Sequence, residues 1–274
     1  MLKKFFVALM ILLLPLKVSA MAQDISIDGY GGTLSAIIQT PDGLQKFPLV
    51  ILCHGFTGEK NSPLLKLIAD KLEANGIASI RFDFNGHGES YGTFQAMTIP
   101  NEIEDAKKVF DFAEKLEGVT SIGVAGHSQG GVVTGMMAGE LGAKKISAIA
   151  LMAPAPILRD DSIRGRLLDL KYDPLNPPEY IEIKLPYGTF RVGRDYILTA
   201  QTLPIFETTE LFTGPALMIH GTGDVISPYT YSLSYKKILR HGEVELLERA
   251  DHGFKGKEQH VAKSVVGFFL RHLK

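Results

Sequence analysis

The stretch TSIGVAGHSQGG, residues 120–131, decides the fold class of this chain. It begins as an apolar run typical of a buried strand and continues into GHSQG, residues 126–130, which matches the pattern G-x-S-x-G. A helical stretch over 131–141 follows. A serine on a sharp strand-to-helix turn is held in a strained backbone conformation, and glycines two positions before and after it leave room for the turn. The stretch therefore predicts that Ser128 is a nucleophile at the carboxyl end of a strand.

Short apolar runs and amphipathic helical stretches alternate on both sides of this turn. Over 99–116, for example, the apolar residues recur at three- and four-residue spacing, as on one buried face of a helix. The alternation predicts an α/β fold with a mostly parallel twisted sheet flanked by helices. The predicted strands are residues 33–39, 48–53, 77–84, 120–125, 146–152, 216–220 and 243–247, and the predicted helices are residues 63–74, 99–116, 131–141, 228–240 and 258–273.

Residues from about 155 to about 210 interrupt this alternation and are rich in proline. Apolar and polar residues alternate over 181–185, a turn follows at 186–188, and a further run covers 189–192, so we expect a β-hairpin there. A short helix is expected near 195–201. Because loops at the carboxyl ends of strands border ligand sites in open α/β sheets, we expect the insertion to form a lid.

The composition excludes several classes of protein. The chain has 274 residues, 45% hydrophobic and 22% charged, with a net charge of -1, which is typical of a globular domain. Basic residues are not in excess, so we expect no nucleic-acid partner. The single cysteine, Cys53, cannot form an internal disulfide or a thiolate metal cluster. We expect no metal and no cofactor.

The first 20 residues are expected to be a signal peptide rather than part of the domain, which would cover 21–274. Lys3 and Lys4 precede an uncharged run over 5–16, and small residues follow at 18–20. An uncleaved membrane anchor is the alternative, but the run is too short to cross about 30 Å of hydrocarbon. We therefore expect an exported protein, periplasmic or secreted, without stable membrane insertion after cleavage.

A serine nucleophile needs a base and an acid that orients the base. His252 directly follows the predicted strand 243–247, and Asp224 follows the predicted strand 216–220. Both therefore lie where a base and an acid are expected in this architecture. Asp251 is the alternative acid, although side chains of adjacent residues rarely meet as such a pair requires. The other histidines near these positions, His220 and His241, are expected to be structural.

A second G-x-S-x-G match centres on Ser90, but it lies in a glycine-rich loop that does not enter a helix, so Ser128 is preferred. The oxyanion that forms on the carbonyl oxygen of the substrate when Ser128 attacks needs backbone donors. We expect these to be the N–H of Gln129 and the N–H of Phe56, in the loop after the predicted strand 48–53. A phosphate-binding loop is the alternative for this segment, but its glycine and lysine spacing does not fit.

With these motifs in place, the chain resembles the α/β-hydrolase superfamily and, within it, the bacterial cinnamoyl (feruloyl) esterases. The resemblance covers essentially all of the chain after the signal peptide. It is carried by HGFTG at 54–58, DFNGHGES at 83–90, GHSQGG at 126–131, AQTLPI at 200–205 and ADH at 250–252.

The resemblance implies a serine carboxylesterase that releases hydroxycinnamic acids such as ferulate from plant polysaccharide esters. By position, Asp161 and Tyr196 in the lid would hold the hydroxyls of the phenolic ring. The expected partners are a small-molecule aryl ester or a feruloylated oligosaccharide, together with a possible homodimer. Two alternatives stay open: a short-acyl carboxylesterase or serine peptidase of the same superfamily, and a binding protein whose triad is idle.

Overall fold

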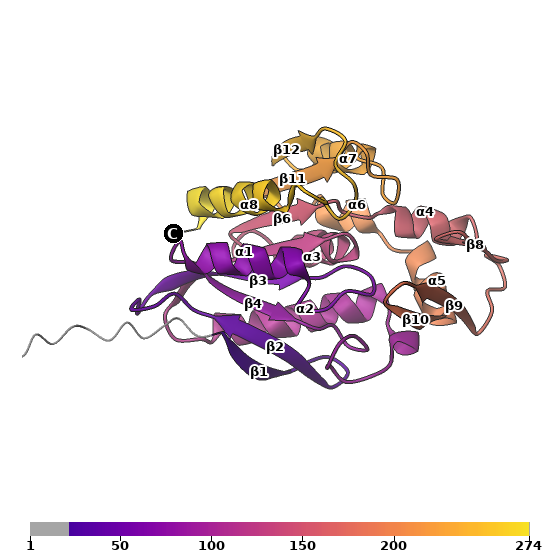
Figure 1. The fold of residues 1–274 in the computed structure, drawn as a ribbon, viewed down its shortest axis with the longest axis horizontal. Helices are drawn as coiled ribbons and strands as arrows, with labels where there is room; N and C mark the ends of the chain where they lie inside the picture. Colours follow the sequence, from indigo (N-terminus) through magenta and orange to yellow (C-terminus); the bar gives the residue numbers. More distant parts are fainter. Residues whose placement is uncertain (1–21, 274) are drawn as a thin grey trace, which may run out of the picture.

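The computed structural model describes residues 22–273, and the predicted signal peptide lies outside these residues. Strands and helices alternate along the chain on either side of one insertion, and the helices lie on both faces of a central sheet (Figure 1). The fold class predicted from the sequence is confirmed. Within residues 22–273, no helix combines the length and the apolar character needed to cross a membrane.

The central sheet contains the eight strands β1 (Gln23–Asp28), β2 (Thr33–Gln39), β3 (Phe47–Cys53), β4 (Ala78–Phe82), β5 (Val119–His127), β6 (Ala148–Met152), β11 (Pro215–Gly221) and β12 (His241–Leu247). Their order across the sheet is β1-β2-β4-β3-β5-β6-β11-β12. The pairs β1–β2 and β2–β4 are antiparallel, and all other pairs are parallel. The six parallel strands therefore bring their carboxyl ends to one edge of the sheet.

Five helices cover the sheet: α1 (Pro63–Glu73), α2 (Ile99–Glu114), α3 (Gln129–Leu141), α7 (Thr230–Ile238) and α8 (Glu258–His272). Side chains of β3 alternate between the two faces: Leu49 and Ile51 belong to the apolar cluster under α2 and α3, whereas Val50 and Leu52 belong to the cluster under α1 and α8. Because both faces are buried, this strand is an uninterrupted apolar run.

Helix α2 shows how local sequence sets an element that later supports the site. Its N-cap Thr98 accepts a hydrogen bond from the N–H of Asn101 at 3.3 Å, and Pro100 lies in the first turn. The apolar face predicted from the spacing is buried, and the carboxyl groups of Glu102 and Asp105 are buried beside it. A buried carboxyl needs hydrogen-bond partners, and those of Glu102 lie next to Ser128.

The insertion between β6 and β11 contains the predicted hairpin, in which Gly188 pairs with Leu185, and the predicted short helix. It also contains two very short strands and two short helices that the sequence did not predict, and its lid role stays a prediction. Its elements are α4 (Ile157–Ile163), β7 (Arg166–Leu167), β8 (Leu170–Lys171), β9 (Tyr180–Leu185), β10 (Gly188–Gly193), α5 (Arg194–Gln201) and α6 (Ile205–Thr209).

Candidate active site

Ser128 lies in the tight turn between β5 and α3, with φ 57° and ψ -120°. Such a conformation costs about 1–3 kcal/mol and persists only where the surroundings fix it. A Cβ on Gly126 would lie 2.0 Å from the carbonyl oxygen of Gly130, and a Cβ on Gly130 would lie 2.3 Å from the carbonyl oxygen of His54. Both glycines are therefore required by the close backbone crossing that presents Ser128.

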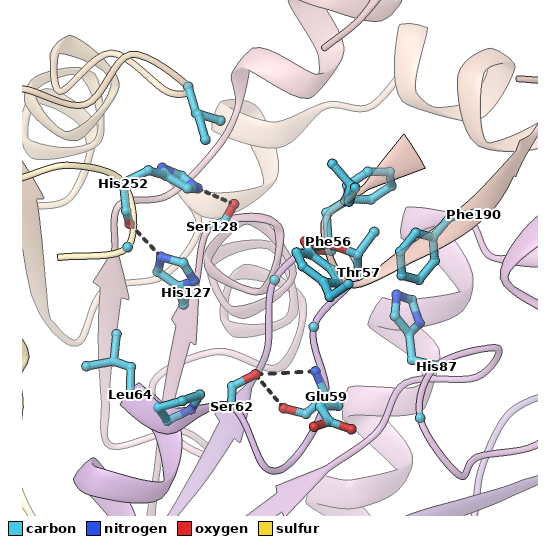
Figure 2. Close-up of a pocket in the computed structure, with 18 of the residues that line it drawn as sticks. Phe56, Thr57, Glu59, Ser62, Leu64, His87, His127, Ser128, Phe190 and His252 are labelled. Atoms are coloured by element: carbon cyan, nitrogen blue, oxygen red, sulfur yellow. Dashed lines mark hydrogen bonds between the residues drawn. The ribbon is translucent and has the colours of Figure 1, made fainter. Parts of the chain in front are cut away.

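The structure brings Ser128, His252 and Asp224 into one hydrogen-bonded chain. His252 Nε2 lies 2.8 Å from Ser128 Oγ (Figure 2). On the other side of the ring, His252 Nδ1 lies 2.7 Å from Asp224 Oδ2. A carboxylate only accepts, so Nδ1 carries the imidazole proton and Nε2 is free to accept the proton of the serine hydroxyl. The side chain of Asp224 is fully buried, and the imidazole of His252 is partly exposed. This is the geometry that nucleophilic catalysis by a serine requires.

Asp224 is held by more than His252. Its Oδ1 accepts the N–H groups of Ile226 and Ser227, both at 2.9 Å, and its Oδ2 lies 3.0 Å from His220 Nε2. Burial alone would raise the pKa of Asp224, but the hydrogen bonds from His220, His252 and Ser227 outweigh it and hold this pKa well below its ordinary value. Asp224 therefore stays ionised, as an acid that orients a histidine must.

Both ring nitrogens of His220 have hydrogen-bond partners, and Asp224 is one of these partners. Its Nε2 lies 2.8 Å from the carbonyl of Ser227, so that nitrogen carries the proton, and its Nδ1 accepts from the hydroxyl of Ser232 at 2.8 Å. A neighbouring histidine, His127, donates from Nε2 to the carbonyl of His252 at 2.8 Å (Figure 2). The contact of His220 thus holds the carboxylate of Asp224, and the contact of His127 holds the main chain of His252.

The loop after β3 brings Phe56 beside the serine. A Cβ on Gly55 would lie 3.0 Å from Ser128 Cβ, so the absence of a side chain at this position allows the close approach. In the described part of the chain, the N–H groups of Phe56 and Gln129 donate to no other group, which leaves both free for an oxyanion. The roles of these two N–H groups remain a proposal.

The far end of this loop is anchored by Lys60. Its ammonium group lies 2.7 Å from both the Asp83 and the Glu89 carboxylates, and its N–H donates to Asp83 Oδ1 at 2.6 Å. Lys60 is almost fully buried in this ion pair. Because the ammonium group already has two carboxylate partners, the phosphate-loop alternative finds no support here.

Two cavities meet at Ser128. The larger, of about 910 Å³, contains His252 and is lined by the aromatic side chains of Phe94, Tyr187 and Phe190. Figure 2 shows His252 and Phe190 at this cavity. The other, of about 640 Å³, lies under the insertion. Apolar side chains at the rim are unusually exposed: Leu168 is 40% exposed, Ile226 50% and Val225 93%. Exposed apolar groups around a hollow are typical of a ligand site.

Asp161 and Tyr196 both line the smaller cavity, together with Arg164 and Arg166. Burial raises the pKa of Asp161 above its ordinary value, and the charges of the two arginines oppose this shift. The hydroxyl of Tyr196 is already engaged, because it donates to Gln129 Oε1 at 2.9 Å, and the residue is only 4% exposed. The oxygen of Tyr196 can still accept a hydrogen bond from a ligand.

The alternative nucleophile Ser90 and the alternative acid Asp251 are not part of the hydrogen-bonded chain from Ser128 to Asp224. The hydroxyl of Ser90 donates to the carbonyl of Asp83 at 2.6 Å and accepts the N–H of Ser35 at 2.8 Å, so it anchors its loop. Asp251 is exposed, and its carboxylate accepts the N–H of Lys255 at 2.8 Å. Within residues 22–273, no group of three or more His, Cys, Asp or Glu side chains is arranged to hold a metal ion.

Sequence reasoning missed the supporting contacts made by His127, His220 and Glu102. His127 lies in the G-x-S-x-G motif and His220 lies four residues before Asp224. These positions in the sequence indicate that both histidines lie close to the site. The hydrogen-bond partner of His127, His252, lies 125 residues further along the sequence. The contact of His220 with Asp224 depends on the directions in which the two side chains point. Glu102 gave no signal, because a glutamate in the first turn of a helix is common.

Comparison with known proteins shows the family to which the chain belongs. A family model described as serine aminopeptidase, S33, matches residues 45–173, which include Ser128 and end before Asp224. In structure, the chain is similar to Est1E from Butyrivibrio proteoclasticus with ferulic acid bound, at 31% identity and a TM-score of 0.85, over 91% of this chain and 99% of that one. The chain belongs to the α/β-hydrolase superfamily.

Two relatives are similar to this chain in sequence. An uncharacterised 31.7 kDa protein from the traX–finO intergenic region of Escherichia coli is 39% identical over 100 residues, which cover 36% of this chain and 35% of that protein. The match thus spans about a third of that relative's length. The mitochondrial palmitoyl-protein thioesterase ABHD10 of Mus musculus is 25% identical over 223 residues, 77% of this chain and 71% of its own length.

Proposed function

We propose that this protein is a serine carboxylesterase that hydrolyses hydroxycinnamate (feruloyl-type) esters through an acyl-enzyme intermediate. The observation that carries the proposal is the chain of 2.8 Å and 2.7 Å contacts from Ser128 through His252 to Asp224. Two N–H groups without a partner among the described residues lie beside the serine, and the similar protein Est1E has ferulic acid bound.

In the proposed reaction, Ser128 Oγ attacks the ester carbonyl while His252 Nε2 takes the hydroxyl proton. Asp224 stabilises the imidazolium that forms, and the N–H groups of Phe56 and Gln129 stabilise the oxyanion. His252 then gives the proton to the departing alcohol oxygen, which leaves an acyl ester on Ser128. A water molecule, deprotonated by His252, attacks this acyl ester, and the carboxylic acid leaves as Ser128 recovers its proton.

In this proposal, the alcohol part and the acyl part of the substrate bind in different cavities. The departing oxygen must lie within reach of His252 Nε2, and His252 lines only the larger cavity, so the alcohol occupies that one. The acyl group then extends into the smaller cavity, towards Asp161 and Tyr196. In the larger cavity, the aromatic wall and the carboxylates of Glu59 and Glu258 suit a hydroxyl-rich alcohol, because sugar hydroxyls donate to carboxylates.

Release of ferulate from methyl ferulate tests the proposal. Wild-type protein should hydrolyse the ester, and Ser128→Ala should lower kcat by at least about 10⁴-fold. Ser90→Ala, which changes the other serine in a G-x-S-x-G context, serves as the matched control and should keep turnover. Full activity in Ser128→Ala would remove the mechanism, and an inactive wild type would remove the substrate class.

A peptide or thioester substrate is the second candidate, because the matching family model is described as a serine aminopeptidase and one relative is a thioesterase. Aminopeptidase substrates, acyl thioesters and short-acyl esters should therefore be assayed beside methyl ferulate. We expect the highest kcat/KM for methyl ferulate. A higher value for an amide would transfer the proposal to the peptidase alternative.

We also propose that the protein acts outside the cytoplasm, in the periplasm or the medium, as the sequence of residues 1–20 predicts. N-terminal sequencing of protein recovered from cell fractions tests this. The expected N-terminus of the exported form is Met21. Recovery of the full chain from the cytoplasmic fraction alone would contradict export.

A further inference from the structure

Glu102 is a buried carboxyl group that the proposed reaction does not use. It lies in the first turn of α2 and is 1% exposed. Burial raises the pKa of Glu102 well above its ordinary value, hydrogen bonds from Gln129 oppose the shift, and the charge of Asp105 adds to it. A carboxyl placed so deep is costly unless its oxygens find donors. The donor that Glu102 has found is the residue after Ser128.

The side chain of Gln129 is held at both of its ends. Its Nε2 lies 3.0 Å and 2.9 Å from the two oxygens of Glu102, and its Oε1 accepts the hydroxyl proton of Tyr196 at 2.9 Å. Gln129 itself is 2% exposed. The three groups come from α3, α2 and α5, so one carboxamide joins the turn after the serine to a helix of the main fold and to a helix of the insertion.

Hydrogen bonds hold the main chain of Ser128: its N–H donates to the carbonyl of Met152 at 2.9 Å, and its carbonyl accepts the N–H of Gly131 at 2.9 Å. Neither bond engages the N–H of Gln129. Positions 130 and 131 are both glycine, so Gln129 carries the only side chain between Ser128 and Val132. The N–H of Gln129 follows directly on the strained backbone of Ser128, and the direction of that N–H depends on ψ of Ser128, which is -120°. The anchored side chain at 129 therefore adds a restraint on the direction of this N–H to those that the main-chain hydrogen bonds supply.

We propose that Glu102 is a positioning residue for the oxyanion hole: it acts through the side chain of Gln129, which Tyr196 fixes from the opposite end. The inference rests on the proposed function, because an oxyanion hole matters only if Ser128 attacks a carbonyl. Loss of the carboxyl leaves the triad contacts intact and lets the N–H of Gln129 turn away from the oxyanion. The effect falls on the transition state rather than on substrate binding.

The test uses a double-mutant cycle on the full chain, Glu102→Leu, Gln129→Leu and both together, with Glu102→Gln as the conservative variant. Glu102→Leu should lower kcat about tenfold with KM changed by less than about twofold, since loss of a whole oxyanion donor costs about 10²–10³-fold. The affinity for an aryl trifluoromethyl ketone, which forms an oxyanion on the serine, should fall by the same factor. Glu102→Gln keeps an acceptor and should recover most of kcat.

The combined variant should be no slower than the slower single variant, because both changes break the same link. Glu104→Leu, on the exposed face of the same helix, is the matched control and should leave both constants unchanged. A folded Glu102→Leu with wild-type kcat and inhibitor affinity would overturn the proposal, as would additive losses in the cycle. If Glu102→Leu does not fold, Gln129→Leu carries the test: a wild-type kcat in that variant overturns the proposal.

Methyl ferulate and p-nitrophenyl acetate are assayed in parallel, so that two kinds of failure can be told apart. Wild-type turnover of the acetate alone rejects the feruloyl substrate and leaves the cycle measurable on the acetate. Turnover of neither ester, together with no labelling of Ser128 by a fluorophosphonate, overturns the proposed function and the role of Glu102 with it.

Discussion

Asp224→Asn is the substitution whose effect the structure defines most fully. Oδ1 of Asp224 accepts two N–H groups, from Ile226 and Ser227, each at 2.9 Å. These two donors are backbone N–H groups, which cannot give up their protons, so the amide nitrogen of an asparagine must take the Oδ2 position. There His252 Nδ1, 2.7 Å away, can lose its proton, and His220 Nε2, 3.0 Å away, keeps the carbonyl of Ser227 as its acceptor. The amide then donates to His252 Nδ1, the imidazole proton moves to Nε2, and His252 can no longer accept the proton of Ser128.

A base in the wrong tautomer lowers kcat by about 10⁴-fold, which corresponds to about 5.5 kcal/mol of transition-state stabilisation. The free energy of unfolding should fall by only about 1–3 kcal/mol, because His220 Nε2 loses one of its two acceptors. The measurements are kcat for methyl ferulate and urea unfolding of the same preparation. Asp251→Asn is the matched control, with an expected kcat within about twofold of wild type. A folded Asp224→Asn that keeps more than about a tenth of kcat would show that Asp224 does not set the tautomer of His252.

Two further predictions concern the supporting structure. Gly55→Ala places a Cβ 3.0 Å from Ser128 Cβ, so kcat should fall about tenfold. Gly267→Ala in α8 is the control: its Cβ would meet no atom within 4 Å, so this variant should keep kcat and gain up to about 1 kcal/mol of stability. Equal kcat in the two variants would contradict the role of the close approach at Gly55. Burial lowers the pKa of both His54 and His127 to about 4 from an ordinary value of 6.5. Between pH 6.5 and pH 4 these histidines are protonated in the unfolded chain but neutral in the folded one. The free energy of unfolding should therefore fall as the pH falls through this range, by about 1.4 kcal/mol per pH unit for each histidine. Urea unfolding that is unchanged across this range would contradict the buried neutral state of the two histidines.

The sequence predicted the parts of the site that depend on strand ends. Ser128, Asp224 and His252 each follow an apolar run, and the carboxyl ends of parallel strands meet at one edge of a sheet. Residues far apart in the chain could therefore be placed together from their local context alone. The hairpin of the insertion was predictable for a similar reason, because its alternation and its turn are both local signals.

Contacts between side chains of different elements could not be predicted in this way. The bond from Tyr196 to Gln129 depends on how the insertion packs on α3, and it engages a hydroxyl that the resemblance assigned to the substrate. The burial of Glu102 depends on which face of α2 meets the site. The short elements β7, β8, α4 and α6 were missed because segments of two to seven residues carry too little periodicity to be recognised.

The proposed reaction depends on Ser128 being a nucleophile that His252 activates. Labelling with a fluorophosphonate, followed by intact-mass and peptide mass spectrometry, tests it most directly because it does not depend on the substrate. We expect a single adduct on the peptide that contains Ser128, no adduct in Ser128→Ala, and labelling slowed by at least about 10³-fold in His252→Ala. An unlabelled wild type, an adduct on another residue, or an undiminished rate in His252→Ala would contradict these roles of Ser128 and His252.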